Sequence, residues 1–72
     1  MLTATARLKD GGLQPCGRVS LDRLRALERD GLRGRSLVHA LTTDDWGAPP
    51  LFLELTGLDE NGQPLRVVIP YE

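Results

Sequence analysis

The residue types that most often perform catalysis or hold metals are scarce in this chain, which contains one histidine, His39, and one cysteine, Cys16. Nucleophilic catalysis needs a base within reach of a serine, cysteine or lysine, and a third group that orients the base. A metal site needs three or four donor atoms, and the adjacent acids Asp44 and Asp45 lack the spaced oxygen ligands of a calcium loop. We therefore expect no enzyme activity, no metal and no cofactor.

Gly12 and Gly17 have the spacing of a phosphate-binding loop, but the residues after Gly17 do not fit that motif. The motif requires a lysine that contacts the terminal phosphates, followed by a serine or threonine that ligates magnesium. Arg18 and Val19 occupy these two positions. The sequence therefore argues against a nucleotide site of this kind.

Arginines form the first group of candidate partner-binding residues. The group comprises Arg25, Arg29, Arg33 and Arg35, on a predicted helix and just beyond it. Residues 1–35 carry eight basic and four acidic side chains, whereas residues 36–72 carry one basic and six acidic ones, so the whole chain stands at −1. A solvated helix face is one alternative and contact with nucleic acid is another. Because a nucleic-acid binder of this size is normally basic overall, we expect these arginines, if they function in binding, to meet an acidic protein surface.

The loop at residues 43–50, TDDWGAPP, supplies a second group of candidates: Asp44, Asp45 and Trp46. Aspartate, glycine and proline favour turns. Trp46 either folds back onto the core as a lid or stands exposed as a contact residue, because tryptophan is enriched at interface hot spots. The two acids beside it would determine which surface charge a partner needs.

Residues 51–71 predict a two-stranded antiparallel hairpin. The Asn-Gly dipeptide alone suggests a two-residue turn, but that register mixes apolar and polar residues on both faces. A three-residue loop at 60–62 instead gathers the aliphatic residues on one face and pairs Leu53 with Ile69. Gly62 then takes the left-handed position of a G1 bulge.

The opposite face of this hairpin is also more apolar than a wetted face requires. It carries Phe52, Val68 and Pro70, and we place Val38 and Ala40 of a neighbouring strand beside them. Apolar patches of this kind mark interfaces. Phe52 and Val68 are therefore the candidate residues for binding a protein partner or a second copy of the chain.

Periodicity and capping signals predict the remaining elements. Alternation indicates a strand at 2–9, and the proline and glycine in residues 13–18 favour either a short edge strand or an irregular loop. Ser20 suits a helix N-cap and Gly31 a left-handed C-terminal cap. Residues 36–42 are apolar on both faces, which is typical of a central strand.

We therefore expect an α+β fold in the order β-α-β-β-β, a small and mostly antiparallel sheet with one helix packed on one face. The predicted elements are strand 2–9, an optional strand 13–18, helix 20–30 and strands 36–42, 51–57 and 65–71. The predicted core is Leu2, Ala4, Ala6, Leu8, Leu21, Leu24, Leu27, Leu37, Leu41, Leu53, Leu55, Val67 and Ile69.

Seventy-two residues make one domain, 1–72, with a core so small that a partner or a homodimer is expected to support it. No apolar run reaches the ~20 residues of a membrane span, and the lone cysteine is typical of a reducing interior. We expect a cytoplasmic, non-enzymatic protein-binding module: an inhibitor or accessory regulatory protein, for example one encoded on a mobile element. The alternative is a nucleic-acid-binding regulator that uses the arginine-rich helix face.

Overall fold

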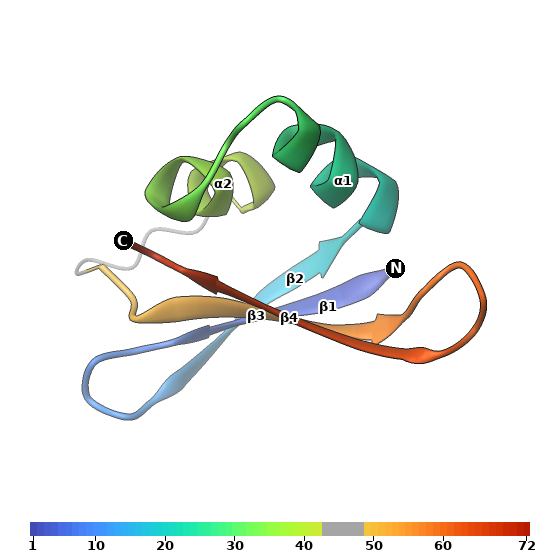
Figure 1. Ribbon diagram of the computed structural model, residues 1–72. Coiled ribbons are helices and arrows are strands. Elements are labelled where there is room, and N and C mark those ends of the chain that lie inside the picture. The colour runs from blue at the N-terminus through green and yellow to red at the C-terminus, as the bar shows by residue number, and fades with distance from the viewer. Residues whose placement is uncertain (43–48) are drawn as a thin grey trace.

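The computed structural model describes residues 1–42 and 49–72, so the candidate residues Asp44, Asp45 and Trp46 lie outside the described part of the chain. Within the described residues the fold is α+β, as predicted, with four antiparallel strands in one sheet and two helices. The elements are β1 (Leu2–Arg7), β2 (Leu13–Val19), α1 (Leu21–Arg29), α2 (Gly34–Leu41), β3 (Phe52–Leu58) and β4 (Pro64–Pro70). Both helices lie on the same side of the sheet (Figure 1). Within residues 1–42 and 49–72, no helix is long and apolar enough to cross a membrane.

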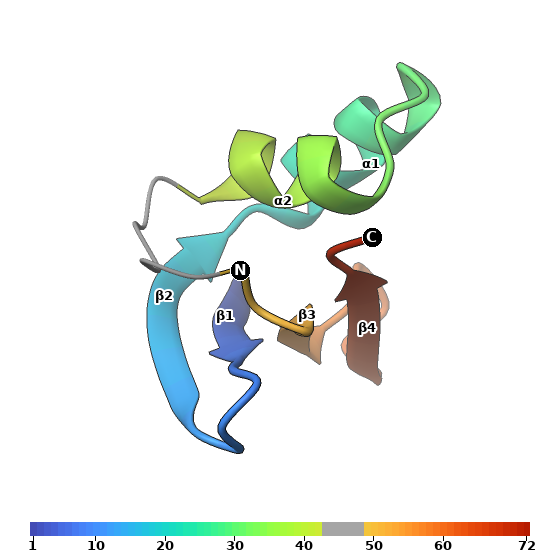
Figure 2. The same ribbon diagram turned by 90° about the vertical axis from the view of Figure 1, so that its left-hand side faces the viewer.

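The sheet has the strand order β2-β1-β3-β4, and every neighbouring pair is antiparallel. Two hairpins, β1–β2 and β3–β4, lie side by side, and β1 pairs with β3 in the middle (Figure 2). In the first hairpin, Leu8 N donates to Gly12 O at 2.9 Å and Gly12 N donates to Asp10 Oδ1 at 2.7 Å. The inward side chains of the central strand β1 include the small residues Ala4 and Ala6, and both are fully buried.

The β3–β4 hairpin has the register that burial of the aliphatic residues predicts. Leu53 pairs with Ile69, and Leu55 pairs with Val67. Gly62 has a φ of 77°, the left-handed conformation that the G1 bulge requires. The predicted three-residue loop is therefore confirmed.

Helix α1 begins and ends where its capping residues predict. Ser20 Oγ accepts the backbone N–H of Arg23 at 3.4 Å, as an N-cap residue does. At the other end Gly31 has a φ of 88°, and Leu32 N donates to Leu27 O at 3.2 Å. That bond belongs to a Schellman motif. Leu27 and Leu32 both pack against the core, which anchors this short helix on the sheet.

The prediction of a strand at 36–42 is wrong, because these residues lie mostly in α2. Leu37 and Val38 are adjacent in sequence yet both buried, and Leu41 packs against the same core. Neighbouring residues of a strand point to opposite faces, whereas positions i, i+1 and i+4 share one side of a helix. A segment of seven residues in which four are apolar fits either structure when it is judged by periodicity alone. The sheet takes its fourth strand from β2, the weaker of the predicted strands, and the fold has two helices where one was expected.

Most of the predicted core is confirmed. The side chains buried as predicted are Leu2, Ala4, Ala6, Leu24, Leu37, Leu53, Leu55 and Ile69. Predicted core residues that are only partly buried are Leu8, Leu21, Leu27, Leu41 and Val67. Val19, Val38 and Tyr71 complete the core. The placement of Val38 and Ala40 beside Phe52 on the sheet is therefore wrong, because both residues belong to α2.

Candidate interaction surface

The residues with the widest chemical range, His39 and Cys16, make packing and hydrogen-bonding contacts. His39 Nε2 lies 2.7 Å from the Tyr71 hydroxyl, and the two rings meet edge to face with centroids 5.5 Å apart. Cys16 Sγ donates to Gln14 O at 3.3 Å. Among residues 1–42 and 49–72, no three His, Cys, Asp or Glu side chains gather as a metal site would require. The first contact joins α2 to the end of the chain beyond β4, and the second lies within β2.

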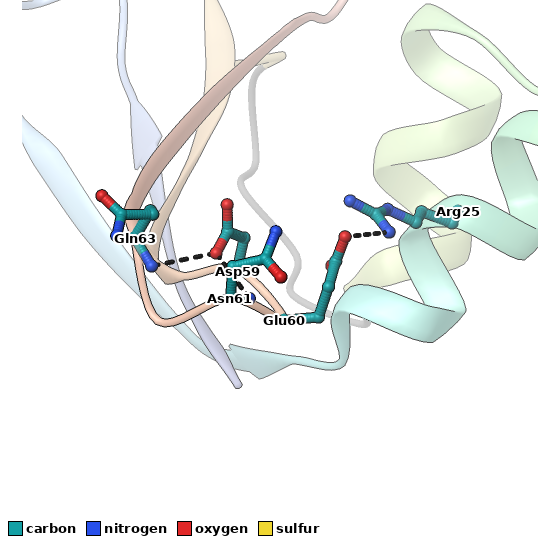
Figure 3. A network of polar contacts seen from close by, with 5 residues as sticks. All are labelled: Arg25, Asp59, Glu60, Asn61 and Gln63. Atoms are coloured by element: carbon teal, nitrogen blue, oxygen red, sulfur yellow. Dashed lines mark hydrogen bonds and ion pairs between the residues drawn. The ribbon is translucent and has the colours of Figure 1, made fainter.

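Arg25 connects α1 to the loop between β3 and β4 (Figure 3). Its Nη1 donates to Glu60 Oε1 at 2.9 Å. Asp59 holds the loop, because its Oδ1 accepts the backbone N–H groups of Asn61 and Gln63, each at 2.9 Å. The hydrogen bond from Arg25 lowers the pKa of the Glu60 carboxyl below its ordinary value. Both side chains of the ion pair are about half exposed, so the pair orients the loop more than it stabilises the fold.

Arg29 lies one turn after Arg25 on α1, and both line one hollow on that helix, whereas Arg33 and Arg35 lie apart from them at the start of α2. Arg35 lies over the ring of Tyr71, with its Cζ 5.4 Å from the ring centroid. Arg29 is exposed on α1, and Arg33 is the N-cap residue of α2. Two of the four candidates, Arg25 and Arg35, are thus engaged within the molecule. They are less available to a partner than the sequence suggests.

The side of the sheet turned away from α1 and α2, the outer face, brings together the other predicted candidates, Phe52 and Val68. In Figure 2 the helices stand on one side of the strands, and no described element lies on the other. Cross-strand pairing arranges the outward side chains in three rows that run from β2 across β1 and β3 to β4, and a fourth row beyond row 3 holds Leu58 of β3 and Pro64 of β4. Row 1 is Leu13, Arg7, Phe52 and Pro70; row 2 is Pro15, Thr5, Glu54 and Val68; row 3 is Arg18, Thr3, Thr56 and Arg66.

Apolar side chains on the outer face gather in rows 1 and 2 and again in the fourth row, where Leu58 is 57% exposed. Leu13 is 62% exposed and Val68 is 41% exposed. Phe52 is half-buried, and both Pro70, its neighbour in row 1, and Pro15, at the β2 end of row 2, are exposed. The surface is therefore apolar over β2 and over β3 and β4, and polar between them on β1.

Charge on the outer face is mostly basic, since the three rows contain three arginines and one acid. That acid, Glu54, accepts hydrogen bonds from its neighbour in the next strand: Arg66 Nε and Nη2 both lie 2.6 Å from Glu54 Oε2. Arg18 is exposed at the end of row 3. The face thus combines an apolar part with three arginines, of which Arg7 lies within row 1 and Arg66 is paired with Glu54.

Sequence reasoning missed the contribution of β2 to this surface. Leu13 and Pro15 alternate with Gln14 and Cys16, a two-residue period that would have placed them on one face of a strand. The proline and glycine in the segment obscured that signal. Even a confident assignment of β2 would not have shown that it lies in the same sheet as Phe52, because pairing between distant strands has no local signature.

Prolines occupy outward-pointing backbone positions on both edge strands. Tyr71 N donates to Leu51 O at 3.1 Å, so alternate β4 residues face β3, and Pro64 and Pro70 fall at the positions between them. Pro15 has the equivalent position on β2, where its neighbours along the strand face β1. Proline lacks the N–H that an added strand would need, so these positions discourage pairing at the sheet edges.

Comparison of the chain with protein-family models, with curated proteins and with solved structures gave no match.

Proposed function

We propose that this protein is a non-enzymatic, cytoplasmic protein-interaction module, which acts as an inhibitor or accessory regulatory protein and binds through the outer face. The observation that supports this proposal is the apolar part of that face. Its members are Leu13, Pro15, Phe52, Val68 and Pro70. They come from both hairpins, yet the fold gathers them on a side of the sheet that no described element covers. Phe52, Val68 and Pro70 adjoin one another on β3 and β4, and contiguous exposed apolar surface is typical of protein interaction sites.

The structure offers less support for nucleic-acid binding through the arginine group. Arg25 pairs with Glu60, and Arg35 lies over Tyr71, so a phosphate would have to compete with contacts that two of the four arginines make within the molecule. We expect no binding to duplex DNA or RNA tighter than roughly 10 μM at physiological salt, a level within the range of non-specific contacts. A fluorescence titration at two salt concentrations measures this. Tight, salt-sensitive binding that is lost in an Arg25→Glu, Arg29→Glu double variant would favour the nucleic-acid alternative.

Site-specific photo-cross-linking in the source cells tests the proposed function. A photoreactive phenylalanine analogue replaces Val68 on the outer face, and in a matched control it replaces Arg29 on the exposed side of α1. If the outer face binds a protein, irradiation joins the position-68 variant to one protein species, and the position-29 variant gives much less of that product. Mass spectrometry then identifies the cross-linked species, including a second copy of this chain.

Two results would contradict the proposal. One is a position-68 variant that folds, as its circular dichroism shows, but gives no specific cross-link. The other is a product of equal yield from both positions, because a contact made by the outer face cannot also be made by the far side of α1. A cross-link from position 29 alone would move the interaction surface to the helices.

A further inference from the structure

We propose that the partner of the outer face is a second copy of this chain, stacked face to face about a two-fold axis that lies parallel to the strands, between β1 and β3. This inference rests on the proposed function, because it takes the outer face as the binding surface and names its occupant. Two stacked antiparallel sheets pack about 10 Å apart with their strands roughly aligned. The product would be an eight-stranded sandwich with the helices on its two outer sides.

The order of residues within the rows supports this axis. Rotation about this axis places each row against the same row of the second copy, with the order of the residues reversed. Row 1 then places Leu13 on Pro70 of the other copy, and it places Arg7 on the ring of Phe52. The first contact joins two apolar side chains, and the second is a cation–π contact. Because both contacts occur twice, row 1 is self-complementary along its whole length.

Row 2 behaves in the same way. Pro15 meets Val68 of the other copy, and Thr5 meets Glu54. The Thr5 hydroxyl can donate to the Glu54 carboxylate, which already accepts hydrogen bonds from Arg66 of its own chain. An ion pair that enters an interface needs such additional hydrogen bonds to offset its desolvation. The one acid in the rows therefore meets a donor rather than another acid.

The other face-to-face two-fold axis, which runs across the strands, fits the rows poorly. Centred on row 2, this axis lays row 1 on row 3, so Leu13 and Pro70 would meet Arg18 and Arg66 of the second copy. Centred between rows 2 and 3, it lays Pro15 and Val68 on the same two arginines. Apolar side chains would cover charged groups in either case. The arrangement of the rows favours the axis parallel to the strands for this reason.

The surface area that a stable dimer must bury also favours the whole outer face as the interface. A standard interface buries about 800 Å² on each partner. That area is roughly one-sixth of the 4737 Å² that this chain exposes, which in so small a protein means one entire side. The sheet edges offer narrow strips, and Pro15, Pro64 and Pro70 remove donors from them.

Row 3 gives this arrangement a distinctive signature. The chosen axis places Arg18 of each copy beside Arg66 of the other, a like-charge contact at the rim that weakens the dimer. Replacing Arg18 with an acid turns both copies of this contact into ion pairs. We therefore expect Arg18→Glu to tighten the dimer about tenfold at low salt, and we expect the gain to shrink as salt increases.

Sedimentation equilibrium of the full chain over a range of concentrations tests the inference. The wild-type protein should sediment as a dimer, and Val68→Asp, which places two carboxylates in the apolar rows, should weaken association at least about a hundredfold. Arg29→Glu makes the same change of charge as Arg18→Glu on the far side of the molecule, and it should leave the dimer constant unchanged. Circular dichroism and thermal unfolding establish that each variant folds.

The outcomes separate this inference from the proposed function. A wild-type protein that stays monomeric at high concentration overturns self-association, and a dimer indifferent to Val68→Asp overturns the outer face as its interface. A dimer weakened by Arg18→Glu overturns the axis. If the chain is monomeric while the photoreactive group at position 68 joins it to a different protein, the proposed function stands and only the second copy is excluded as the occupant.

Discussion

Gly62 shows how one residue fixes the register of the β3–β4 hairpin. Its φ of 77° lies in the left-handed region, and its N–H donates to Asp59 O at 3.0 Å, which closes the loop. A Cβ atom built on Gly62 would meet nothing within 4 Å, so any cost of substitution comes from backbone strain and not from a clash. The register in turn decides which side chains of β4 face the helices and which reach the outer face.

Replacing Gly62 with valine should therefore destabilise the fold by about 1 kcal/mol or more, because a β-branched residue resists the left-handed conformation. Gly62→Asn should cost less, since asparagine adopts this conformation more readily. Urea denaturation measures both variants. An unchanged midpoint for the valine variant would contradict the G1-bulge loop.

Glu60 provides a prediction about pH. Its carboxyl pKa is lower in the folded chain than its ordinary value because Arg25 donates to it. A group whose pKa is depressed by folding stabilises the native state above its ordinary pKa, and that contribution is lost as the pH falls through the lowered value. NMR titration should show the Glu60 midpoint rising in Arg25→Gln and staying in place in the matched variant Arg29→Gln. A midpoint that is the same in wild type and Arg25→Gln would show that the ion pair does not persist in solution.

At the scale of elements, predictability followed the strength of local signals. The N-cap Ser20 and the C-terminal Gly31 delimit α1, and both are visible in the sequence. The hairpin of β3 and β4 could be predicted because its turn chemistry and its alternation agree. Helix α2 has no capping side chain, and its N-cap residue Arg33 gives no local signal. The prediction for this segment therefore depended on periodicity alone, and the segment is too short for periodicity to distinguish a helix from a strand. The capped elements were therefore recognised and the uncapped helix was not.

Helix α2 makes a test of that correction possible. Leu37→Ala should cost about 2–4 kcal/mol and Val38→Ala about 2 kcal/mol, because both side chains are buried in the same core. Ser36→Ala, at an exposed position of the same helix, should change stability by less than about 0.5 kcal/mol. Denaturant unfolding of the three variants measures these differences. Sensitivity at only one of the two adjacent positions would indicate the alternation of a strand.

At the scale of the whole molecule, the fold brings together the basic first half and the acidic second half of the chain, and so partly neutralises their opposite charges. Arg25 from the basic half pairs with Glu60 from the acidic half, and the pairing of β1 with β3 joins the halves in one sheet. The outer face draws on both halves, with Leu13 from one and Phe52 and Val68 from the other. The sequence could predict the second part of that face from a single hairpin. The first part depends on contacts between distant strands, which no local pattern encodes.

The central claim is that the outer face is covered by a second copy of the chain, and intermolecular NOEs test it most directly. In a mixed sample of isotope-labelled and unlabelled protein, a half-filtered experiment detects only contacts between copies. We expect NOEs from the methyl groups of Val68 to the ring of Pro15, and from the methyl groups of Leu13 to the ring of Pro70. Neither contact can arise within one chain, because β2 and β4 lie at opposite edges of the sheet. A sample without such NOEs at high concentration, or one whose intermolecular NOEs come from α1 and α2, would contradict the account.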